Sequence, residues 1–384
     1  MKRKKILWLV SWYPNRKDAF DGDFIQRHAR AAAIYHDIYV IFVTPDFTNI
    51  EKTEEVISRA TGLTEQVIYF KPGTGLGSKI LNHFTWKNVF MLAAENYISK
   101  NGKPDLVHVH VPWKAGIIAL HLKNYFQVPY MITEHWGIYN TKAPDHFNTQ
   151  PFFLKRYLRR IYSEASRILT VSKYSADGLS KFLHVNKVDI IPNVVDSTLF
   201  VPKQEKYERF SFIHVSNMVG LKNVDIMLEA FAGFLNRTGA DAQFILAGDR
   251  DDTYRKMASD QGLFNRSVFF RGEISYREVA EEMGRCHCFV IFSDTETFSC
   301  VTAEALCTGL PVIASRSGAL PELVDENSGV LVPPRDKEAL IVAMEKVFRE
   351  YKRFDVNSIS ALAREKFNYS AVAAMFNSHY EKGL

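Results

Sequence analysis

The segment SDTETFSCVTAEALCTGLPVIASRSGALPELVDENSGVLVPP, residues 293–334, decides the fold class of this chain. It follows the apolar run CFVIF with a polar loop, a short helical pattern that ends near Gly309, and a second apolar run, PVIAS. A strand, a loop, a helix and a strand in this order form a βαβ unit, and ligands of such units gather at the carboxyl ends of the strands. The segment therefore predicts a parallel sheet with a ligand site at that edge.

Two acidic residues in this segment are separated by seven residues. Glu296 lies in the polar loop, and Glu304 lies one to two turns into the helix. Glu304 shares its helix face with Cys300, Val301 and Cys307, so its carboxylate has apolar neighbours. A carboxylate buried there is costly unless something hydrogen-bonds it. Vicinal sugar hydroxyls would do so, and a neighbouring helix cap or an arginine is the structural alternative.

Short apolar runs alternate with longer helical patterns over the whole chain. This alternation predicts parallel sheets covered on both faces, and hence an α/β fold with two doubly wound domains. Two prolines around a polar turn place the boundary between the domains at 192–202, so we expect domains over 1–195 and 196–369. The expected strands are KILWLV, IYVIFV, DLVHVH, PYMIT, RILTVS and KVDIIP, then FSFIHVS, AQFILAG, SVFFRG, CFVIFS, PVIAS and GVLVP.

Composition narrows the class of protein without naming a ligand. The 384 residues are 47% apolar and carry a net charge of +5, which suits anionic substrates or an anionic membrane without requiring either. No run reaches the roughly 18 apolar residues of a transmembrane helix, so we expect a cytoplasmic location. The spacing of the four cysteines fits neither a zinc site nor a disulfide framework, so buried free thiols are expected.

The central segment resembles the signature of glycosyltransferase family 4. The matching features are the E-x7-E spacing, EALCTGLPVIAS, GALPEL and SGVLVPP, and the resemblance extends over nearly the whole chain. It implies the GT-B fold, in which two Rossmann-like domains face each other across a deep cleft. The first domain would bind the acceptor, the second would bind a nucleotide-diphosphate sugar, and a final helix over 370–384 would cross back to the first. No metal ion, other cofactor or nucleic acid is implied.

The resemblance assigns roles to the residues of the central segment. Glu296 would contact hydroxyls of the donor sugar, and Glu304 would hold the ribose. Backbone amides around Phe298, Ser299 and Cys300 would face the diphosphate. This assignment agrees with elementary physics, because the start of a helix offers unpaired N–H groups and partial positive charge to an anion.

A second stretch of the donor domain, HVSNMVGLKNVDIMLEAF, resembles the family segment whose arginine and lysine hold the diphosphate. Lys222 fits the lysine position, but Asn217 stands where arginine is usual. Asparagine supplies neither a charge nor a bidentate fork, so Arg250 or Arg271 would have to compensate, unless each is a surface ion-pair residue. Gly248 ends a strand and would let the nucleotide approach, and the stretch that begins at Arg271 would cradle the base.

The first domain offers His135 and Gly22 as candidate site residues. His135 directly follows the strand PYMIT, a position where polar residues point toward ligands. The resemblance gives it a hydrogen bond to the donor sugar, and a structural histidine bonded to a carbonyl is the alternative. Gly22 lies in a loop that the family places at the reaction centre, although a plain turn explains it equally. His110 is a further candidate at a strand end, whereas His108 is expected to pack inside.

The stretch PFFLKRYLRRIYSEASR, residues 151–167, predicts a basic aromatic helix. We expect Phe153, Tyr157 and Ile161 on one face, with four basic residues around them. Such a helix either lies on the inner face of an anionic membrane or packs on the core as an ordinary surface helix. A second mixed patch on the acceptor side comprises Lys71, Lys79, Phe84, Trp86 and Lys87.

These features favour a retaining hexosyl- or N-acetylhexosaminyl-type transferase that uses a UDP- or GDP-sugar and a lipid-linked or saccharide acceptor in cell-surface polysaccharide assembly. The alternatives are an epimerase or hydrolase on the same scaffold, or a binding protein impaired by Asn217. No G-x-G-x-x-G follows the first strand, which argues against a dinucleotide-dependent dehydrogenase. Asp249, Asp251 and Asp252 fit a solvated turn better than a metal site, so activity without metal is expected.

Overall fold

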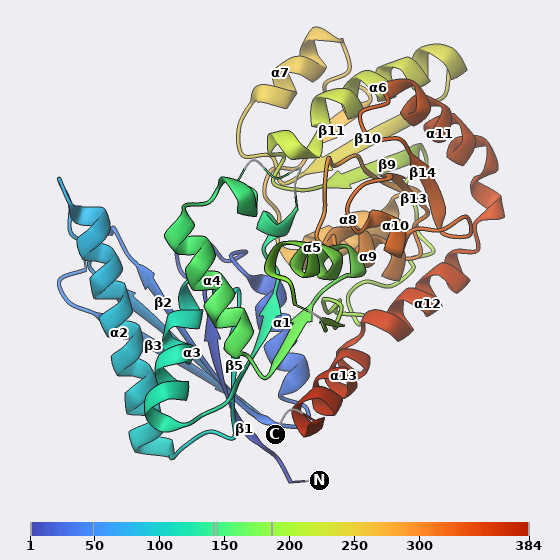
Figure 1. Cartoon of the computed structure of the whole chain (residues 1–384). Helices are drawn as coiled ribbons and strands as arrows, with labels where there is room; N and C mark the ends of the chain where they lie inside the picture. The colour runs from blue at the N-terminus through green and yellow to red at the C-terminus, as the bar shows by residue number, and fades with distance from the viewer. Residues whose placement is uncertain (1, 49, 141–142, 144, 186, 383–384) are drawn as a thin grey trace. The chain divides into compact units, whose positions relative to one another are not determined.

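A computed structural model describes residues 2–48, 50–140, 143, 145–185 and 187–382 (Figure 1). The chain divides into two compact units. Unit 1 comprises Met1–Val194 and Tyr369–Leu384, and unit 2 comprises Val195–Asn368.

Unit 1 is built on an eight-stranded sheet in the order β3-β4-β2-β1-β5-β6-β7-β8. All neighbouring strands are parallel except the antiparallel pair β3 and β4. The central strands β1, β5 and β6 are almost entirely buried, as expected for apolar runs covered on both faces. The strands are β1 (Lys5–Val10), β2 (Asp37–Pro45), β3 (Glu54–Ala60), β4 (Leu63–Phe70), β5 (Leu106–His110), β6 (Tyr130–Glu134), β7 (Arg167–Thr170) and β8 (Asp189–Ile190).

All six strands expected in the first half are present, but the expectation missed β3 and β4, which add an antiparallel hairpin to the sheet. β3 has the sequence EEVISRA and is exposed along most of its length, so it lacks the apolar run that marks a buried strand. The turn between the two strands contains Gly62, whose φ of +73° suits glycine. Polar edge strands of this kind are difficult to recognise from hydrophobicity alone.

The helices of unit 1 cover both faces of its sheet (Figure 1). The last helix, α13, belongs to this unit and packs on the central strands: the Phe376 ring lies 5.9 Å from Trp8, and the Tyr380 hydroxyl lies 2.8 Å from His108 Nδ1. Residues 383–384 of the expected final helix lie outside the described residues. The helices are α1 (Asp23–Ala32), α2 (Ser78–Asn101), α3 (Pro112–Phe126), α4 (Phe152–Glu164), α5 (Lys173–Leu183), α13 (Tyr369–Lys382), η1 (Gly137–Tyr139) and η2 (Phe147–Thr149).

Unit 2 is built on a six-stranded, fully parallel sheet in the order β11-β10-β9-β12-β13-β14. All six expected strands are present, because each is an apolar run of the kind that predicts a buried parallel strand. The chain continues from β9 in one direction and from β12 in the other, so the topological switch point lies between these two neighbours. The strands are β9 (Phe210–Val215), β10 (Ala242–Ala247), β11 (Val268–Phe270), β12 (Cys288–Ile291), β13 (Val312–Ser315) and β14 (Gly329–Val332).

The helices of unit 2 surround this sheet and bury a second hydrophobic core. None of the four cysteines forms a disulfide with a described residue. Cys286, Cys288 and Cys307 are buried, as expected, whereas Cys300 is partly exposed, so the expectation of a buried thiol was wrong for that residue. The helices are α6 (Val224–Thr238), α7 (Thr253–Asp260), α8 (Tyr276–Arg285), α9 (Cys300–Cys307), α10 (Leu320–Leu323), α11 (Lys337–Glu350), α12 (Val356–Phe367), η3 (Gly220–Lys222) and η4 (Tyr351–Arg353).

Candidate functional site

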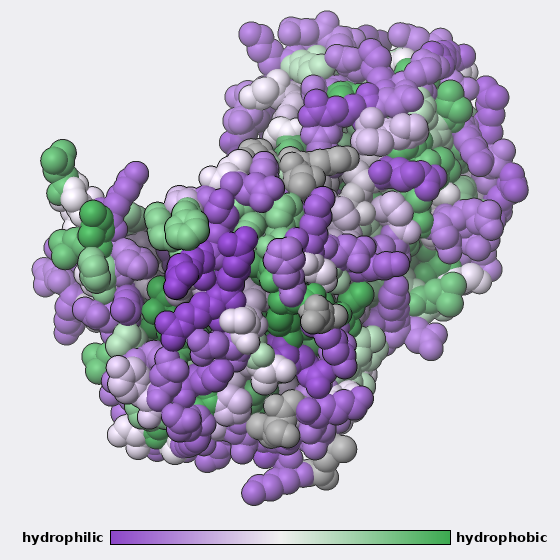
Figure 2. All heavy atoms as spheres, in the orientation of Figure 1, coloured by the Kyte–Doolittle hydropathy of each residue, from purple (hydrophilic) through white to green (hydrophobic). Residues whose placement is uncertain are grey.

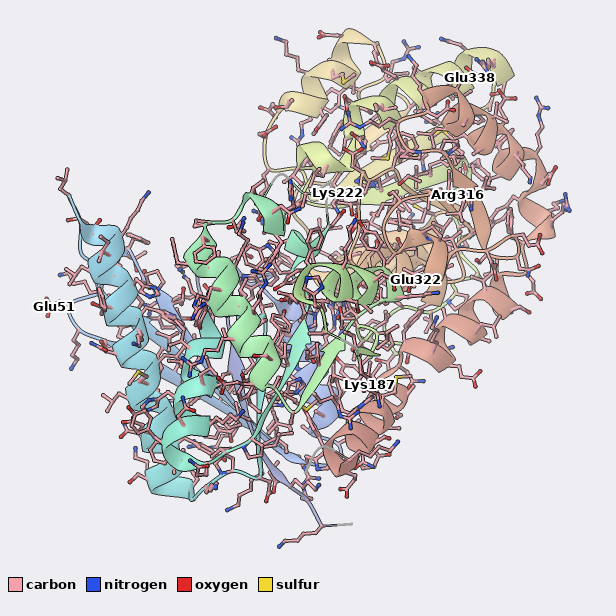
Figure 3. The ribbon with its side chains drawn as sticks, in the orientation of Figure 1. Glu51, Lys187, Lys222, Arg316, Glu322 and Glu338 are labelled. Carbon is pink, nitrogen blue, oxygen red and sulfur yellow. The ribbon has the colours of Figure 1, made fainter. Side chains whose placement is uncertain are left out.

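The structure joins two of the predicted site residues of unit 2 directly. Lys222, at the end of η3 and labelled in Figure 3, places its Nζ 2.5 Å from Glu296 Oε1. The Ser293 hydroxyl donates to the same carboxylate oxygen over 2.7 Å. The side chains of Lys222 and Glu296 are 19% and 12% exposed, so the pair is shielded but still reachable from solvent. A cation and a carboxylate therefore lie together at the carboxyl ends of β9 and β12, the topological switch point.

A set of residues that the sequence did not point to fixes the two loops of this pair. The Asp294 amide donates to the Leu221 carbonyl, and the Asn223 side chain donates to the Phe292 carbonyl and to Asp294 Oδ1. Arg335 binds Asp294 with two hydrogen bonds, of 2.8 and 2.5 Å. Bidentate pairs of this type restrict geometry strongly. These bonds fix the loop that carries Lys222 relative to the loop that carries Glu296.

Gly318 explains why the motif GALPEL follows the two acidic residues. A Cβ atom at this position would lie 2.3 Å from the Glu296 carbonyl oxygen and 2.4 Å from its amide nitrogen. The φ of Gly318 is +55°, and the next amide, of Ala319, donates to the Glu296 carbonyl. Glycine at 318 thus lets the loop after β13 pack directly on the backbone of Glu296.

The start of α9 is where the sequence predicts that the diphosphate binds, and this role stays a prediction. Ser299 precedes the helix with φ 77° and ψ 81°, a strained conformation for a residue other than glycine, and its hydroxyl shares a hydrogen bond with Thr302. The first-turn amides of a helix have no partner within it. Phe298 is buried, and Cys300 begins the helix. Glu304 is buried as expected, at 3% exposure.

Asn217 and Gly248 lie on the turns after β9 and β10. Asn217 is exposed, and its side chain makes no hydrogen bond within the part of the chain that the structure describes. Gly248 has φ +100°, and a Cβ there would lie 2.1 Å from the Ser216 carbonyl oxygen. The neighbouring strand end alone therefore requires glycine at 248, whether or not a nucleotide approaches it.

The two arginines proposed as substitutes are already paired. Arg271 donates to Glu282 over 3.3 Å and to the Tyr207 hydroxyl over 3.4 Å, and Arg250 donates to Glu273 over 2.8 Å. This is the surface ion-pair alternative that the sequence left open. A role for Arg271 in nucleotide binding stays a prediction and would require it to leave these partners.

In unit 1, His135 lies directly after β6 in a cluster of buried histidines. Its Nε2 is 3.1 Å from His110 Nδ1, the rings of His28 and His135 are 5.5 Å apart, and His28 Nε2 is 2.9 Å from the Pro192 carbonyl. Burial lowers the pKa of His28 to about 4 and lowers the pKa values of His110 and His135 well below the ordinary value. The cluster is therefore neutral near pH 7.

Ring nitrogens of His28, His110 and His135 lie within 4.8 Å of one another. Three neutral imidazoles could hold a transition-metal ion, but an ion would have to replace the bond between His110 and His135. One nitrogen of each ring has no hydrogen-bond partner among the described residues, including Nδ1 of His135. His135 Nδ1 is itself buried, and the predicted hydrogen bond from His135 to the donor sugar stays a prediction. Activity without metal stays a prediction.

Glu134 is a buried acid that the sequence analysis missed. Its Oε1 accepts the amides of His135 and Trp136, each over 2.8 Å, and its Oε2 accepts the Tyr162 hydroxyl. Burial raises its pKa to about 7, against the lowering effect of these donors. Glu134 therefore fixes the turn that carries His135. Its position beside His135 at a strand end was the available signal.

Gly22 lies immediately before α1 with φ 64°. A Cβ at this position would lie 2.6 Å from the Trp12 carbonyl carbon, so the loop itself requires glycine. The predicted place of Gly22 at the reaction centre stays a prediction.

Helix α4 presents to the core a face that only partly matches the expected one. Leu154, Leu158 and Ile161 are buried, whereas Phe153 is 72% exposed and its neighbour Phe152 is 73% exposed. Of the three residues expected on one face, Ile161 is buried and Tyr157 packs against the core, whereas Phe153 lies in the first turn and is exposed. None of the helices in the described ranges has both the length and the apolar character that crossing a bilayer requires.

Comparison with known families gives two matches that together cover most of the chain. The model described as "Glycosyltransferase Family 4" matches residues 25–199, and the model described as "Glycosyl transferases group 1" matches residues 196–361. Among curated proteins, the chain is 26% identical over 314 residues to the MMP alpha-(1->4)-mannosyltransferase of Mycolicibacterium hassiacum, covering 78% of this chain and 75% of that protein.

Solved structures share the fold over the full length. Sucrose-phosphate synthase from Thermosynechococcus elongatus superposes with a TM-score of 0.80 at 20% identity, covering 99% of both chains. HepE from Anabaena, in complex with UDP, superposes with a TM-score of 0.73 at 18% identity, covering 98% of this chain and 100% of that one.

Proposed function

The chain belongs to the group 1 glycosyl transferases of glycosyltransferase family 4, with the GT-B fold, and from this premise we propose that it transfers a sugar from a UDP- or GDP-sugar with retention of configuration. The single observation that carries the proposal is the contact between Lys222 and Glu296 at the switch point of unit 2. The solved structure of HepE in complex with UDP supports the proposal that the donor is a sugar linked to a nucleotide.

Transfer of a sugar from a nucleotide requires the departing diphosphate to be stabilised as the glycosidic bond breaks. Lys222 and the first-turn amides of α9 would supply that stabilisation, at about 3 kcal/mol for each well-placed donor. Glu296 would hold the hydroxyls of the donor sugar, and Glu304 would hold the ribose. A same-face substitution, in which the leaving phosphate oxygen takes the acceptor's proton, would give the retained configuration through an oxocarbenium-like transition state.

The acceptor is proposed to be lipid-linked or a saccharide, bound by unit 1. Exposed aromatic side chains at the start of α4, Phe152 and Phe153, support a peripheral contact with the membrane. Exposed arginines follow them on the same helix at 156, 159 and 160. Aromatic residues beside basic ones favour the interface of an anionic bilayer.

The experiment is a turnover assay of purified protein with a panel of UDP- and GDP-sugars, in EDTA and in added divalent metal. We expect release of nucleoside diphosphate from at least one donor, with equal rates under both conditions. NMR of the product should show the same anomeric configuration as the donor. Strict dependence on added metal, or an inverted product, would contradict the proposal, and Glu296→Gln serves as the control for a contaminating activity.

A further inference from the structure

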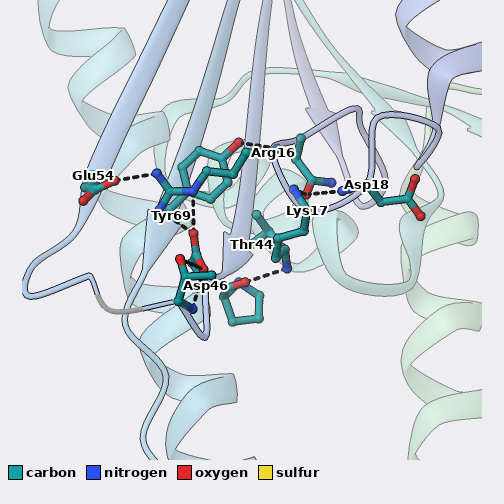
Figure 4. Close-up of polar contacts among 10 residues, drawn as sticks. Arg16, Lys17, Asp18, Thr44, Asp46, Glu54 and Tyr69 are labelled. Carbon is teal, nitrogen blue, oxygen red and sulfur yellow. Dashed lines mark hydrogen bonds and ion pairs between the residues drawn. The ribbon is translucent and has the colours of Figure 1, made fainter. Parts of the chain in front are cut away.

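Three basic side chains, Lys17, His83 and Lys114, gather near the carboxyl end of β2 in unit 1, and Lys87 is close enough to His83 to lower its pKa. These four residues are called the basic cluster. Lys17 comes from the loop after β1, and its ammonium donates to the Thr44 hydroxyl over 2.9 Å and to the Pro45 carbonyl over 2.6 Å (Figure 4).

Trp86 of α2 brings two other members of the basic cluster to the same place. Its indole N–H donates to the Val43 carbonyl over 3.1 Å, one residue before Thr44. The ammonium of Lys114 lies 5.6 Å from the centre of the Trp86 ring, and the His83 ring stacks on that ring at 6.0 Å. The loop after β1 and the helices α2 and α3 therefore each bring a basic side chain to the carboxyl end of β2.

The basic cluster lacks matching negative charge. Lys17, Lys87 and Lys114 make no ion pair with any carboxylate among the described residues, whereas the adjacent Arg16 is neutralised by Asp46 and Glu54 (Figure 4). Burial lowers the pKa of Lys114, and the nearby charge of Lys17 lowers it further.

The pKa shifts of the neighbouring residues also indicate that the basic cluster carries excess positive charge. Burial lowers the pKa of His83, with further lowering from Lys114 and Lys87. Asp21 interacts with Lys17 only at longer range, and its own pKa is raised to about 6, first by burial and then by Asp18. The cations of the basic cluster therefore act mainly on one another.

The start of α3 adds to the positive potential. Lys114 lies in the first turn of this 15-residue helix, which contains no acidic residue. The amino end of a helix carries partial positive charge and normally favours Asp or Glu, so lysine there is unfavourable in the absence of an anion. Like charges gathered in this way reduce stability and favour the binding of an anion.

We propose that the basic cluster is the subsite that binds a phosphate group of the acceptor. Lys17 and Lys114 provide the direct contacts, and Trp86 supports the ammonium of Lys114. The proposal rests on the proposed function, because it defines the class of acceptor: a phosphorylated molecule, either a soluble sugar phosphate or the phosphate headgroup of a lipid.

The test is calorimetric titration with glucose 6-phosphate and with glucose, in saturating UDP or GDP so that the donor site is already filled. We expect the phosphate, and not glucose, to bind. Lys17→Gln and Lys114→Gln should each weaken this binding about tenfold or more, because each removes a charge-assisted hydrogen bond. Lys100→Gln on α2 is the control: it removes the same charge from an exposed position, and its affinity should stay within about twofold.

A parallel arm replaces glucose 6-phosphate with vesicles of phosphatidylcholine containing phosphatidic acid. Binding only to these vesicles, weakened by Lys17→Gln and Lys114→Gln, would identify a lipid headgroup as the source of the phosphate. Absence of phosphate binding in both arms, or equal binding by the wild type and both variants, would overturn the inference. Wild-type protein that turns over a donor in that case would leave the proposed function standing, whereas wild-type protein with no donor turnover would refute the proposed function itself.

Discussion

The contact between Lys222 and Glu296 makes a prediction whose sign is unusual for a site residue. A diphosphate that binds Lys222 must compete with the Glu296 carboxylate, 2.5 Å away. A hydrogen bond between charged groups contributes roughly 1.5–3 kcal/mol, and partial exposure of this pair reduces that amount. Glutamine at 296 can still accept one hydrogen bond, so we expect Glu296→Gln to release about 1 kcal/mol and to tighten nucleoside diphosphate binding about fivefold.

The same substitution should abolish most of the transfer activity. Loss of a group that orients the donor sugar in the transition state costs about a hundredfold or more in rate. Calorimetry with UDP and GDP measures the affinity, and initial rates of transfer measure the loss. Glu326→Gln removes one negative charge from an exposed position in the same unit and should change neither quantity.

Lys222→Gln completes the comparison, because it removes the cation that the diphosphate would bind. Its nucleoside diphosphate affinity should fall about tenfold or more. A Glu296→Gln variant that binds nucleoside diphosphate more weakly and retains its transfer rate would refute the reasoning, because Glu296 would then support binding of the nucleotide and not of the sugar.

Three further predictions concern two buried titratable groups of unit 1 and one glycine of unit 2. Burial lowers the pKa of His28 from an ordinary 6.5 to about 4, so folding favours its neutral form. The free energy of unfolding of unit 1 should therefore fall by about 3 kcal/mol as the pH drops from 6.5 toward 4. Urea unfolding should show a smaller fall for His28→Gln over the same pH range. Glu134 should have the opposite effect on stability, because its pKa is raised to about 7 and folding disfavours its charged form. The free energy of unfolding should fall by about 3 kcal/mol as the pH rises from 4.5 to 7, and Glu134→Gln should remove this pH dependence. A wild-type stability that does not change over this pH range would contradict the prediction. Gly318→Ala places a Cβ within 2.4 Å of the Glu296 backbone and should abolish transfer, whereas Gly239→Ala, with a similar φ of +61° and nothing within 4 Å, should only lower the melting temperature by a few degrees.

The strands of unit 2 were predictable because each is a short apolar run between polar loops. β3 and β4 were not, because one strand of an edge hairpin is exposed and reads as polar. The core-facing residues of α4 were predicted only in part, because several apolar sets fit a helical period in a short aromatic segment. Ile161 and Tyr157 pack on the core as expected, but packing selects Leu154 and Leu158 in place of Phe153.

In the candidate site, residues of one continuous motif could be predicted from the sequence, whereas partners that lie far apart in the chain could not. Glu296, Glu304 and Ser299 lie in one continuous motif, so their proximity follows from the βαβ unit. Arg335 lies 41 residues beyond Asp294, and no spacing rule relates the two. Partners of this kind come from loops that meet only in the folded sheet, so the residues that fix the site could not be read from the sequence.

Asn217, at the position where arginine is usual in the family, leaves unit 2 with fewer cations for a diphosphate. Asparagine brings no charge to the turn after β9, and Arg250 and Arg271 are engaged with Glu273 and Glu282. The charge of a diphosphate would therefore be balanced by Lys222 and by backbone amides of α9. A single cation in that role has to be positioned well before the ligand arrives, because a flexible lysine loses side-chain entropy on binding. The bond to Glu296 would hold Lys222 in place for the diphosphate, at the cost that the diphosphate has to compete with the Glu296 carboxylate.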